Sequence, residues 1–191
     1  MGQMPSKIYV GLVHYPIYDK RHAVVASAVT NFDLHDIART ARTFGVNGFY
    51  MITPLESQIR LIQRILHHWT DGKGSIYNAT RKESFSLVRI AKTIEEASEE
   101  ISISCERQTL RVATGANPHP RSLSFGEMRR IIEGSEAPFL ILFGTGWGLT
   151  HEVKESCDYI LMPIEGRGYN HLPVRAAVAI ILDRLLGDRV F

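Results

Sequence analysis

Apolar residues in this chain fall into two patterns that alternate from one end to the other. Short continuous apolar runs, typical of strands buried on both faces, occur at 7–14, 48–53, 86–91, 110–113, 139–143 and 158–163. Apolar residues at helical spacing lie between these runs and predict helices at 33–44, 54–69, 93–103, 124–133 and 172–187. This alternation predicts an α/β fold, in which a mostly parallel sheet carries helices on both faces.

Capping and breaking residues suggest where the first helices begin and end. Asp33 is placed to cap the first helix, and Gly45 follows it where a helix usually stops. Pro54 stands at an early position of the second helix. Residues 71–85 are polar and rich in glycine, which predicts a mobile excursion and not a domain boundary.

The bulk composition limits the class of protein. With 191 residues, 45% of them hydrophobic, the chain suits one domain spanning residues 1–191. It has no apolar run long enough to cross a membrane and no secretion-signal pattern, so we expect a cytoplasmic location. Its two cysteines form neither a metal motif nor a disulfide framework. The net charge of +2 permits an anionic partner without requiring one.

Two predicted strands near the C-terminus each end in a glycine-rich loop. The first loop reads Gly144-Thr-Gly-Trp-Gly148 and the second Gly166-Arg-Gly168, about 20 residues further on. Glycines directly after strands let bare backbone approach a ligand, so the pair suggests one small molecule held by main chain. The alternative is that these glycines only form tight turns.

A dinucleotide or nucleoside-triphosphate site fits this segment poorly. The spacing is G-x-G-x-G instead of G-x-G-x-x-G, and no phosphate-loop lysine follows. Only about nine residues separate Gly148 from the strand near Asp158, whereas a full parallel crossover needs a dozen or more.

The chain resembles the SPOUT class of RNA methyltransferases over about residues 8–187. The matching C-terminal pieces are Phe143-Gly-Thr-Gly-Trp-Gly-Leu149, Met162-Pro163 and Leu172-Pro-Val174. An earlier motif of the ribose-methylating branch corresponds to Asp33, Arg39-Thr40 and Gly45. The resemblance is closest to a small stand-alone group that also occurs fused to tRNA guanine-N1 methyltransferases.

This resemblance implies a trefoil knot made by residues from about 139 to 187, a bound S-adenosylmethionine and a homodimer whose active sites use both subunits. The last predicted helix is apolar nearly all round, which independently suggests that a partner covers part of it. The sequence departs from the family pattern at Thr145, which replaces a glutamate, and at His171 and Pro173, which replace a serine and an asparagine.

The cofactor is expected to contact backbone and apolar side chains after three strands. The predicted cofactor-binding residues are Thr114, Gly115, Leu142, Phe143, Gly144, Gly148, Leu161, Met162, Ile164, Gly166, Gly168, Leu172 and Val174.

On the acceptor side, the resemblance makes Arg39 the residue that activates a ribose 2′-hydroxyl, with Asp33 as a second catalytic candidate. Because the guanidinium pKa is above ~12, positioning or phosphate-assisted action is easier for Arg39 than simple base catalysis. A surface ion pair between Asp36 and Arg39 is the alternative. The predicted substrate-binding residues are Arg42, His119, Arg121, Arg167 and His171. No H-x-x-x-H helix face occurs, so no metal site is expected.

The sequence therefore predicts an S-adenosylmethionine-dependent RNA methyltransferase that acts on tRNA, with ribose 2′-O as the favoured acceptor. A base nitrogen such as guanine N1 remains an alternative, for which Asp33 or Glu165 would be the acidic base. A cofactor-binding or RNA-binding module without catalysis is the alternative from another class.

Overall fold

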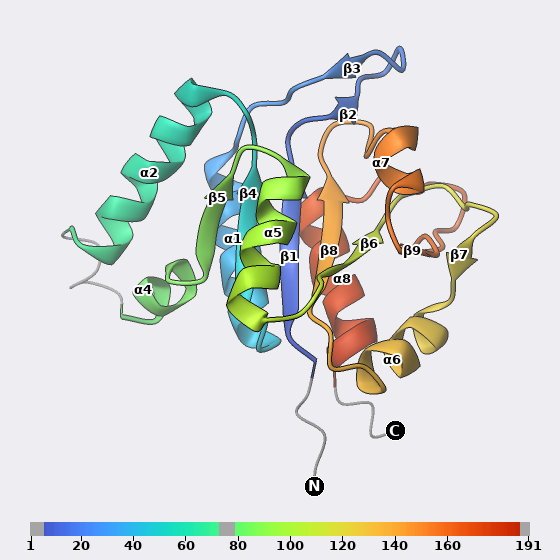
Figure 1. The fold of residues 1–191 in the computed structure, drawn as a ribbon. Helices are drawn as coiled ribbons and strands as arrows, with labels where there is room; N and C mark the ends of the chain where they lie inside the picture. Colours follow the sequence, from blue (N-terminus) through green and yellow to red (C-terminus); the bar gives the residue numbers. More distant parts are fainter. Residues whose placement is uncertain (1–5, 73–78, 188–191) are drawn as a thin grey trace, which may run out of the picture.

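A parallel sheet forms the centre of the computed structural model, which describes residues 6–72 and 79–187 (Figure 1). Its strands are β1 (Ile8–Val13), β4 (Gly48–Ile52), β5 (Val88–Ala91), β6 (Leu110–Ala113), β7 (Ser122–Leu123), β8 (Phe139–Gly144) and β9 (Tyr159–Leu161). They lie in the order β5-β4-β1-β8-β6-β9-β7, and every neighbouring pair is parallel. The six predicted strands and their parallel arrangement are confirmed.

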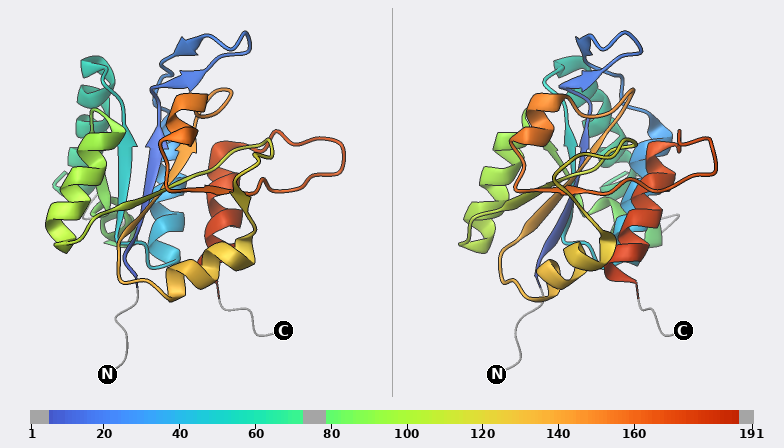
Figure 2. Two further views of the ribbon diagram at one scale, coloured as in Figure 1. Left: turned by 45° about the vertical axis from the view of Figure 1, so that its right-hand side comes forward. Right: turned by 90° about the vertical axis from the view of Figure 1, so that its right-hand side faces the viewer.

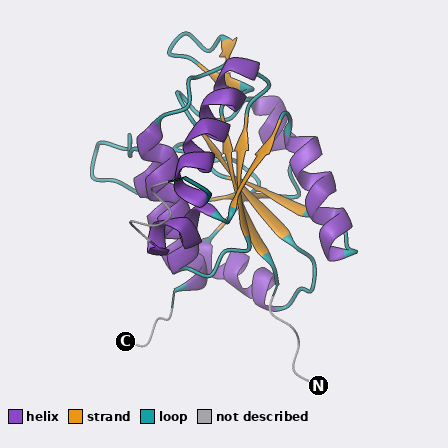
Figure 3. Cartoon of the chain, turned by 90° about the vertical axis from the view of Figure 1, so that its left-hand side faces the viewer, coloured by secondary structure: helices purple, strands orange, loops and turns teal. Residues whose placement is uncertain are grey.

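Helices cover both faces of this sheet, as Figure 3 shows. One face carries α1 (Asn31–Thr43), α2 (Glu56–Thr70), α4 (Ala79–Phe85), α6 (Phe125–Glu133) and α8 (Val174–Leu186). The other carries α5 (Ile94–Cys105) and α7 (His151–Glu155). A short antiparallel hairpin, β2 (Ile17–Tyr18) and β3 (Val24–Val25), stands beyond the sheet. Among the described residues, no helix is both long and apolar enough to cross a membrane.

The continuous apolar runs exist because both faces of the central strands are buried. In β8, Phe139 and Ile141 pack toward α1, α6 and α8, whereas Leu140 and Leu142 pack toward α5 and α7. Alternate side chains of a strand point to opposite faces, so two cores require apolar residues at every position.

Three local predictions need correction. Helix α1 is capped by Thr30 and not by Asp33, because the Thr30 hydroxyl accepts the Asp33 backbone N–H and the helix starts at Asn31. Residues 79–85, predicted as part of a polar loop, form α4, which buries Phe85 in the core. The rest of that predicted excursion includes 73–78, outside the described residues. Helix α2 begins at Glu56, two residues after Pro54.

The strand order brings the loops of the C-terminal third together. Because all seven strands are parallel, β1, β6, β8 and β9 end at the same edge of the sheet. Strand β8 lies between β1 and β6, and β9 lies between β6 and β7, so late strands are inserted among earlier ones. The segment from β9 to α8 projects from this edge as a long loop (Figure 2). Ligands of open α/β sheets bind at such edges.

Candidate active site

A cavity of about 960 Å³ opens at the carboxyl ends of the central strands. Four segments supply most of its wall: the connection from β3 into α1, residues 114–117 after β6, residues 143–148 at the end of β8, and residues 170–175 before and at the start of α8. The rest of the lining is His22, Lys154, Ile164, Ala177 and Ile181. Its size is in the range of ordinary small-molecule sites.

Most of the predicted cofactor residues meet at this cavity. Those that line it are Thr114, Gly115, Phe143, Gly144, Gly148, Ile164, Leu172 and Val174. Those that do not line it are Leu142, Leu161, Met162, Gly166 and Gly168. The Leu142 carbonyl accepts hydrogen bonds from the Thr114 backbone N–H (3.1 Å) and hydroxyl (2.9 Å), and the Met162 N–H donates to the Leu123 carbonyl. These groups hold the cavity wall together.

The first glycine loop folds back tightly on itself. A Cβ at position 144 would lie 2.4 Å from the Leu149 nitrogen, and Gly148 has a φ of +97°. Both positions therefore require glycine. Strand β2 holds the loop from outside, through hydrogen bonds that join Tyr18 to Trp147 and Gly148. The glycines serve a tight turn, as the alternative interpretation proposed, and that turn forms one cavity wall.

A buried hydrogen-bond relay fixes the loop to β1. The Thr145 hydroxyl donates to the Val13 carbonyl (3.0 Å), so it accepts from Ser27, whose oxygen is 2.6 Å away. Ser27 therefore accepts from Nδ1 of His14 at 2.9 Å. This order places the ring proton on Nδ1 and leaves Nε2 as a bare acceptor, which is buried and has no hydrogen-bond partner in the described part of the chain. Ser27 and Thr145 line the cavity, so the relay supports its wall.

Burial lowers the pKa of His14 from 6.5 to about 4, against an opposing effect of the Asp33 charge. Between these values the unfolded chain binds a proton that the folded chain excludes. Lowering the pH from 6.5 toward 4 should therefore reduce the free energy of unfolding by about 1.4 kcal/mol per pH unit through this residue. Urea unfolding between pH 5 and 7 measures the slope.

His14→Asn keeps a donor near the position of Nδ1 and removes the titration, so its stability should depend less on pH. His68→Ala, a change at an exposed position of α2, should keep the native slope. Equal slopes in the native chain and His14→Asn would contradict the assignment.

Asp33 is a buried carboxylate that lines the cavity. It accepts a hydrogen bond from the Thr30 hydroxyl (2.6 Å) and lies 3.6 Å from the Arg175 guanidinium. Arg175 also pairs with Asp36 at 3.4 Å, so this arginine ties α8 to α1. The sequence suggested an ion pair between Asp36 and Arg39. In the structure the partner of Asp36 is Arg175 instead. No local pattern points to Arg175, because it lies on another helix.

Arg39 does not line this cavity. It is exposed on α1 and borders a separate hollow of about 330 Å³, whose wall also includes Ala179 of α8. Arg42 forms an ion pair with Glu83 of α4, which fixes its guanidinium away from the cavity. Within one chain, the two arginines therefore lie apart from the proposed cofactor site.

The other predicted substrate residues lie in three different places. His171 lines the cavity and stands between two exposed aromatic side chains, with ring centroids 5.8 Å from Trp147 and 5.4 Å from Tyr169. His119 and Arg121 instead pair with Glu155 of α7. Arg167 is exposed on the projecting loop and does not line the cavity.

Lys154 of α7 was not predicted from the sequence and is a basic side chain beside the 114–117 segment. Its Nζ would lie 3.2 Å from a Cβ at Gly115, and burial lowers the pKa of its amine. On the opposite side, the Asn170 amide donates to the Ala116 carbonyl and joins the projecting loop to the same segment. Helix α7 has only five residues, so its sequence does not indicate that Lys154 lines a cavity.

These features fit an adenosyl amino acid. Phe143, Ile164 and Ile181 give apolar surface for a purine, and the Lys154 amine provides a positive charge for a carboxylate. The absence of a side chain at Gly115 leaves room beside that amine.

Comparison with known proteins identifies the family. The model of a family described as SAM-dependent RNA methyltransferase matches residues 7–187. The chain belongs to this family of S-adenosylmethionine-dependent RNA methyltransferases. The resemblance predicted from the glycine loops is thereby confirmed, and S-adenosylmethionine is the cofactor of the family.

Relatives of this chain occur in two lengths. A protein of Oleidesulfovibrio alaskensis, named tRNA (guanine-N(1)-)-methyltransferase, is 46% identical over 95% of this chain, which covers only 42% of that relative. An uncharacterized protein of Aquifex aeolicus is 41% identical, with 94% of this chain and 88% of the relative covered. The chain thus spans less than half of the named relative.

A solved structure shares the fold of this chain. The TrmH/SpoU tRNA modifying enzyme of A. aeolicus superposes with a TM-score of 0.56 at 17% identity, covering 96% of this chain and 75% of the other. At this level of identity the likeness supports the SPOUT architecture alone.

Proposed function

We propose that this chain transfers a methyl group from S-adenosylmethionine to RNA, with tRNA as the substrate and ribose 2′-O as the first choice of acceptor. The observation that carries the proposal is the convergence of the 114–117, 143–148 and 170–175 segments on one cavity. The names of the relatives support tRNA as the substrate, although the chain covers only part of the named one.

The cofactor is held by this chain's own residues. Phe143, Ile164 and Leu172 would contact the adenine, and Lys154 would pair with the carboxylate of the methionine portion. The bound cofactor supplies an electrophilic methyl group. The protein's main task is then to align the acceptor oxygen and exclude poor geometries.

Arg39 reaches the acceptor only if a second chain brings it there. We therefore propose a homodimer in which α1 and α8 of one chain face the site of the other. The hollow bordered by Arg39 and Ala179 supports this arrangement, as does the half-buried apolar surface that α8 presents at Ala176 and Ile180. In the dimer Arg39 binds an RNA phosphate or ribose oxygen and steers the acceptor.

We also propose that residues 1–191 form a single domain and that the chain forms a trefoil knot from about residue 139. The insertion of β8 and β9 between strands formed earlier in the chain supports a threaded path. Knotted chains are rare exceptions to the usual threading rules.

Guanine N1 is the second candidate acceptor, and one observation favours it. Asp33 places a carboxylate in the cavity, where an acidic base for a purine nitrogen is needed. Both of its oxygens already have partners in the described part of the chain, the Arg175 guanidinium and the Thr30 hydroxyl, which keeps ribose as the first choice. Glu165 lies on the exposed loop and does not line the cavity.

Product analysis tests the proposal and separates the acceptors. Bulk tRNA from cells that lack the protein is incubated with the purified chain and methyl-labelled S-adenosylmethionine, then digested to nucleosides. Label in a 2′-O-methylnucleoside is the expected result. Label in 1-methylguanosine would support the second candidate. Tight cofactor binding with no label in any RNA would contradict catalysis and favour a binding module.

A further inference from the structure

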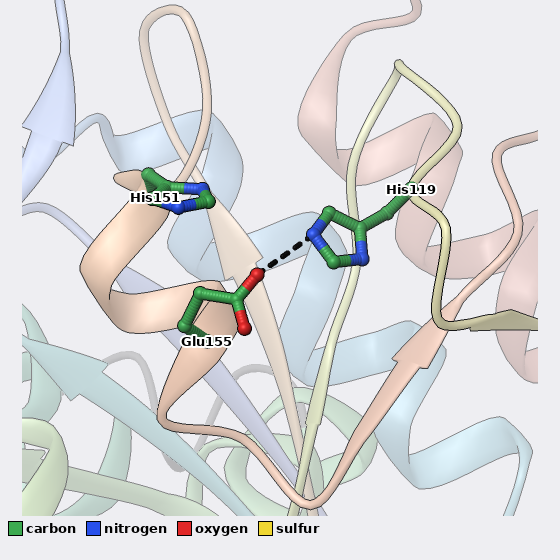
Figure 4. A group of neighbouring side chains, drawn as sticks. All are labelled: His119, His151 and Glu155. Atoms are coloured by element: carbon green, nitrogen blue, oxygen red, sulfur yellow. Dashed lines mark hydrogen bonds and ion pairs between the residues drawn. The ribbon is translucent and has the colours of Figure 1, made fainter.

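We infer that His119, His151 and Glu155 form a binding site for one divalent transition-metal ion, with Zn²⁺ as the best match. The three side chains come together from two segments, the loop after β6 and helix α7, as Figure 4 shows. Their potential ligand atoms all lie within 4.8 Å of one another. This cluster stands apart from the residues that line the cavity.

The geometry is close to what zinc requires. Metal–ligand bonds of about 2.0–2.2 Å in a tetrahedral site place neighbouring ligand atoms roughly 3.4 Å apart. Nε2 of His119 is already 2.9 Å from Oε1 of Glu155. His151 and Glu155 are four residues apart on α7, so their side chains lie on the same helix face. Side-chain rotation must bring the three ligand atoms, which lie within 4.8 Å of one another, to that spacing.

The third ligand is available because His151 has no competing role. Its ring makes no hydrogen bond within the described part of the chain, and its centroid lies 6.4 Å from the ring of His119. The absence of paired histidines on one helix face led to the expectation of no metal site. The site here uses a His-x-x-x-Glu pair instead, with its second histidine supplied by a loop.

Arg121 orients the carboxylate in the way that outer residues orient metal ligands. It donates to Oε2 of Glu155 at 3.0 Å and to the Cys157 carbonyl at 3.0 Å, which leaves Oε1 directed at His119. The Arg121 backbone N–H donates to Nδ1 of His119 at 3.2 Å, so Nε2 carries the ring proton without metal. Coordination through Nε2 would require that proton to leave the ring or move to Nδ1, and with the proton on Nδ1 this atom could no longer accept the Arg121 backbone N–H.

Two histidines and one carboxylate favour zinc among available ions. Imidazole nitrogen suits Zn²⁺, Co²⁺, Ni²⁺ and Cu²⁺, whereas Mg²⁺ and Ca²⁺ prefer oxygen-only ligands. A bound ion would join the 114–121 loop to α7. Both segments also supply cavity wall, through residues 114–117 and through Lys154, so the metal would brace the cofactor site from outside.

Titration of the full chain with Co²⁺ alone tests this site, using protein without an affinity tag and without cofactor or RNA. The expected result is one ion per chain with visible absorption of a four-coordinate site, displaced by Zn²⁺. His119→Ala and His151→Ala should each weaken Co²⁺ binding at least 10-fold. Glu155→Gln should also weaken Co²⁺ binding, and it changes the shape of the side chain less than an alanine substitution does.

Matched controls are Glu152→Gln on the same helix and His68→Ala on α2, both exposed, which should bind as the native chain does. Zn²⁺ should also raise the melting temperature of the native chain and not of His151→Ala. Absence of saturable binding, or unchanged affinity in both histidine variants, would overturn the inference whether or not methyl transfer is found.

Discussion

Replacing Arg39 with alanine should lower RNA methylation by about 100-fold or more while leaving S-adenosylmethionine affinity unchanged. Arg39 lies outside the cavity of its own chain, so its loss should not disturb the cofactor walls. A residue that positions the acceptor affects the rate, and a misplacement of about 1 Å costs on the order of 10²-fold. Initial rates of methyl incorporation and cofactor affinity, measured on the same preparation, give the two quantities.

Three further variants make this result specific. Arg39→Lys keeps the charge and loses the planar fork of donors, so it should recover only part of the activity. Arg60→Ala removes an exposed arginine from α2 and should retain native activity. Because Arg39 is proposed to act across a dimer, mixing Arg39→Ala with a chain defective in cofactor binding should restore activity at one of the two sites. Full activity of Arg39→Ala alone would refute its role.

Gly144→Ala should abolish measurable cofactor binding, an expected loss of about 100-fold or more, or ~2.7 kcal/mol. The added Cβ would meet the Leu149 nitrogen at 2.4 Å and the Gly148 carbonyl carbon at 2.7 Å. These are backbone atoms, so the loop must move as a whole. The 143–148 segment, which forms one wall of the cavity, would then be displaced. Titration calorimetry measures the affinity.

Gly126 provides the matched control for this substitution. A Cβ at Gly126 in α6 would meet no atom within 4 Å. Gly126→Ala should therefore bind cofactor normally and raise stability by about 0.5–1 kcal/mol. Circular dichroism and thermal unfolding must show that Gly144→Ala remains folded at the temperature of the titration. Native affinity in folded Gly144→Ala would contradict the role of this loop.

The sheet was predictable because it is buried on both faces. A short, continuous apolar run such as Phe139–Gly144 is typical of a parallel strand that has a core on each side. Helix α7 was missed because five residues show no helical period, although Thr150 caps it by accepting the Val153 N–H. The cap of α1 was misplaced because Thr30 and Asp33 both have side chains suited to that position.

Site residues could be predicted from the sequence only where they lie in glycine-rich loops that directly follow strands. Such loops indicate a close approach of main chain, and Phe143, Gly144 and Gly148 do reach the cavity. Residues such as His14, Lys154 and Arg175 have roles that depend on partners distant in the sequence. No local pattern distinguishes them from ordinary surface or core residues. The same holds for the hydrogen bonds that join Leu142 to Thr114 and Met162 to Leu123, which no local pattern indicates.

The most direct test of the cofactor site is calorimetric titration of the native chain with S-adenosylmethionine, without RNA. We predict saturable binding with one cofactor per chain, together with a higher melting temperature when the cofactor is present. A titration that gives no heat at saturating cofactor, with an unchanged melting temperature, would contradict the claim that the cavity beyond β6, β8 and β9 is a cofactor site.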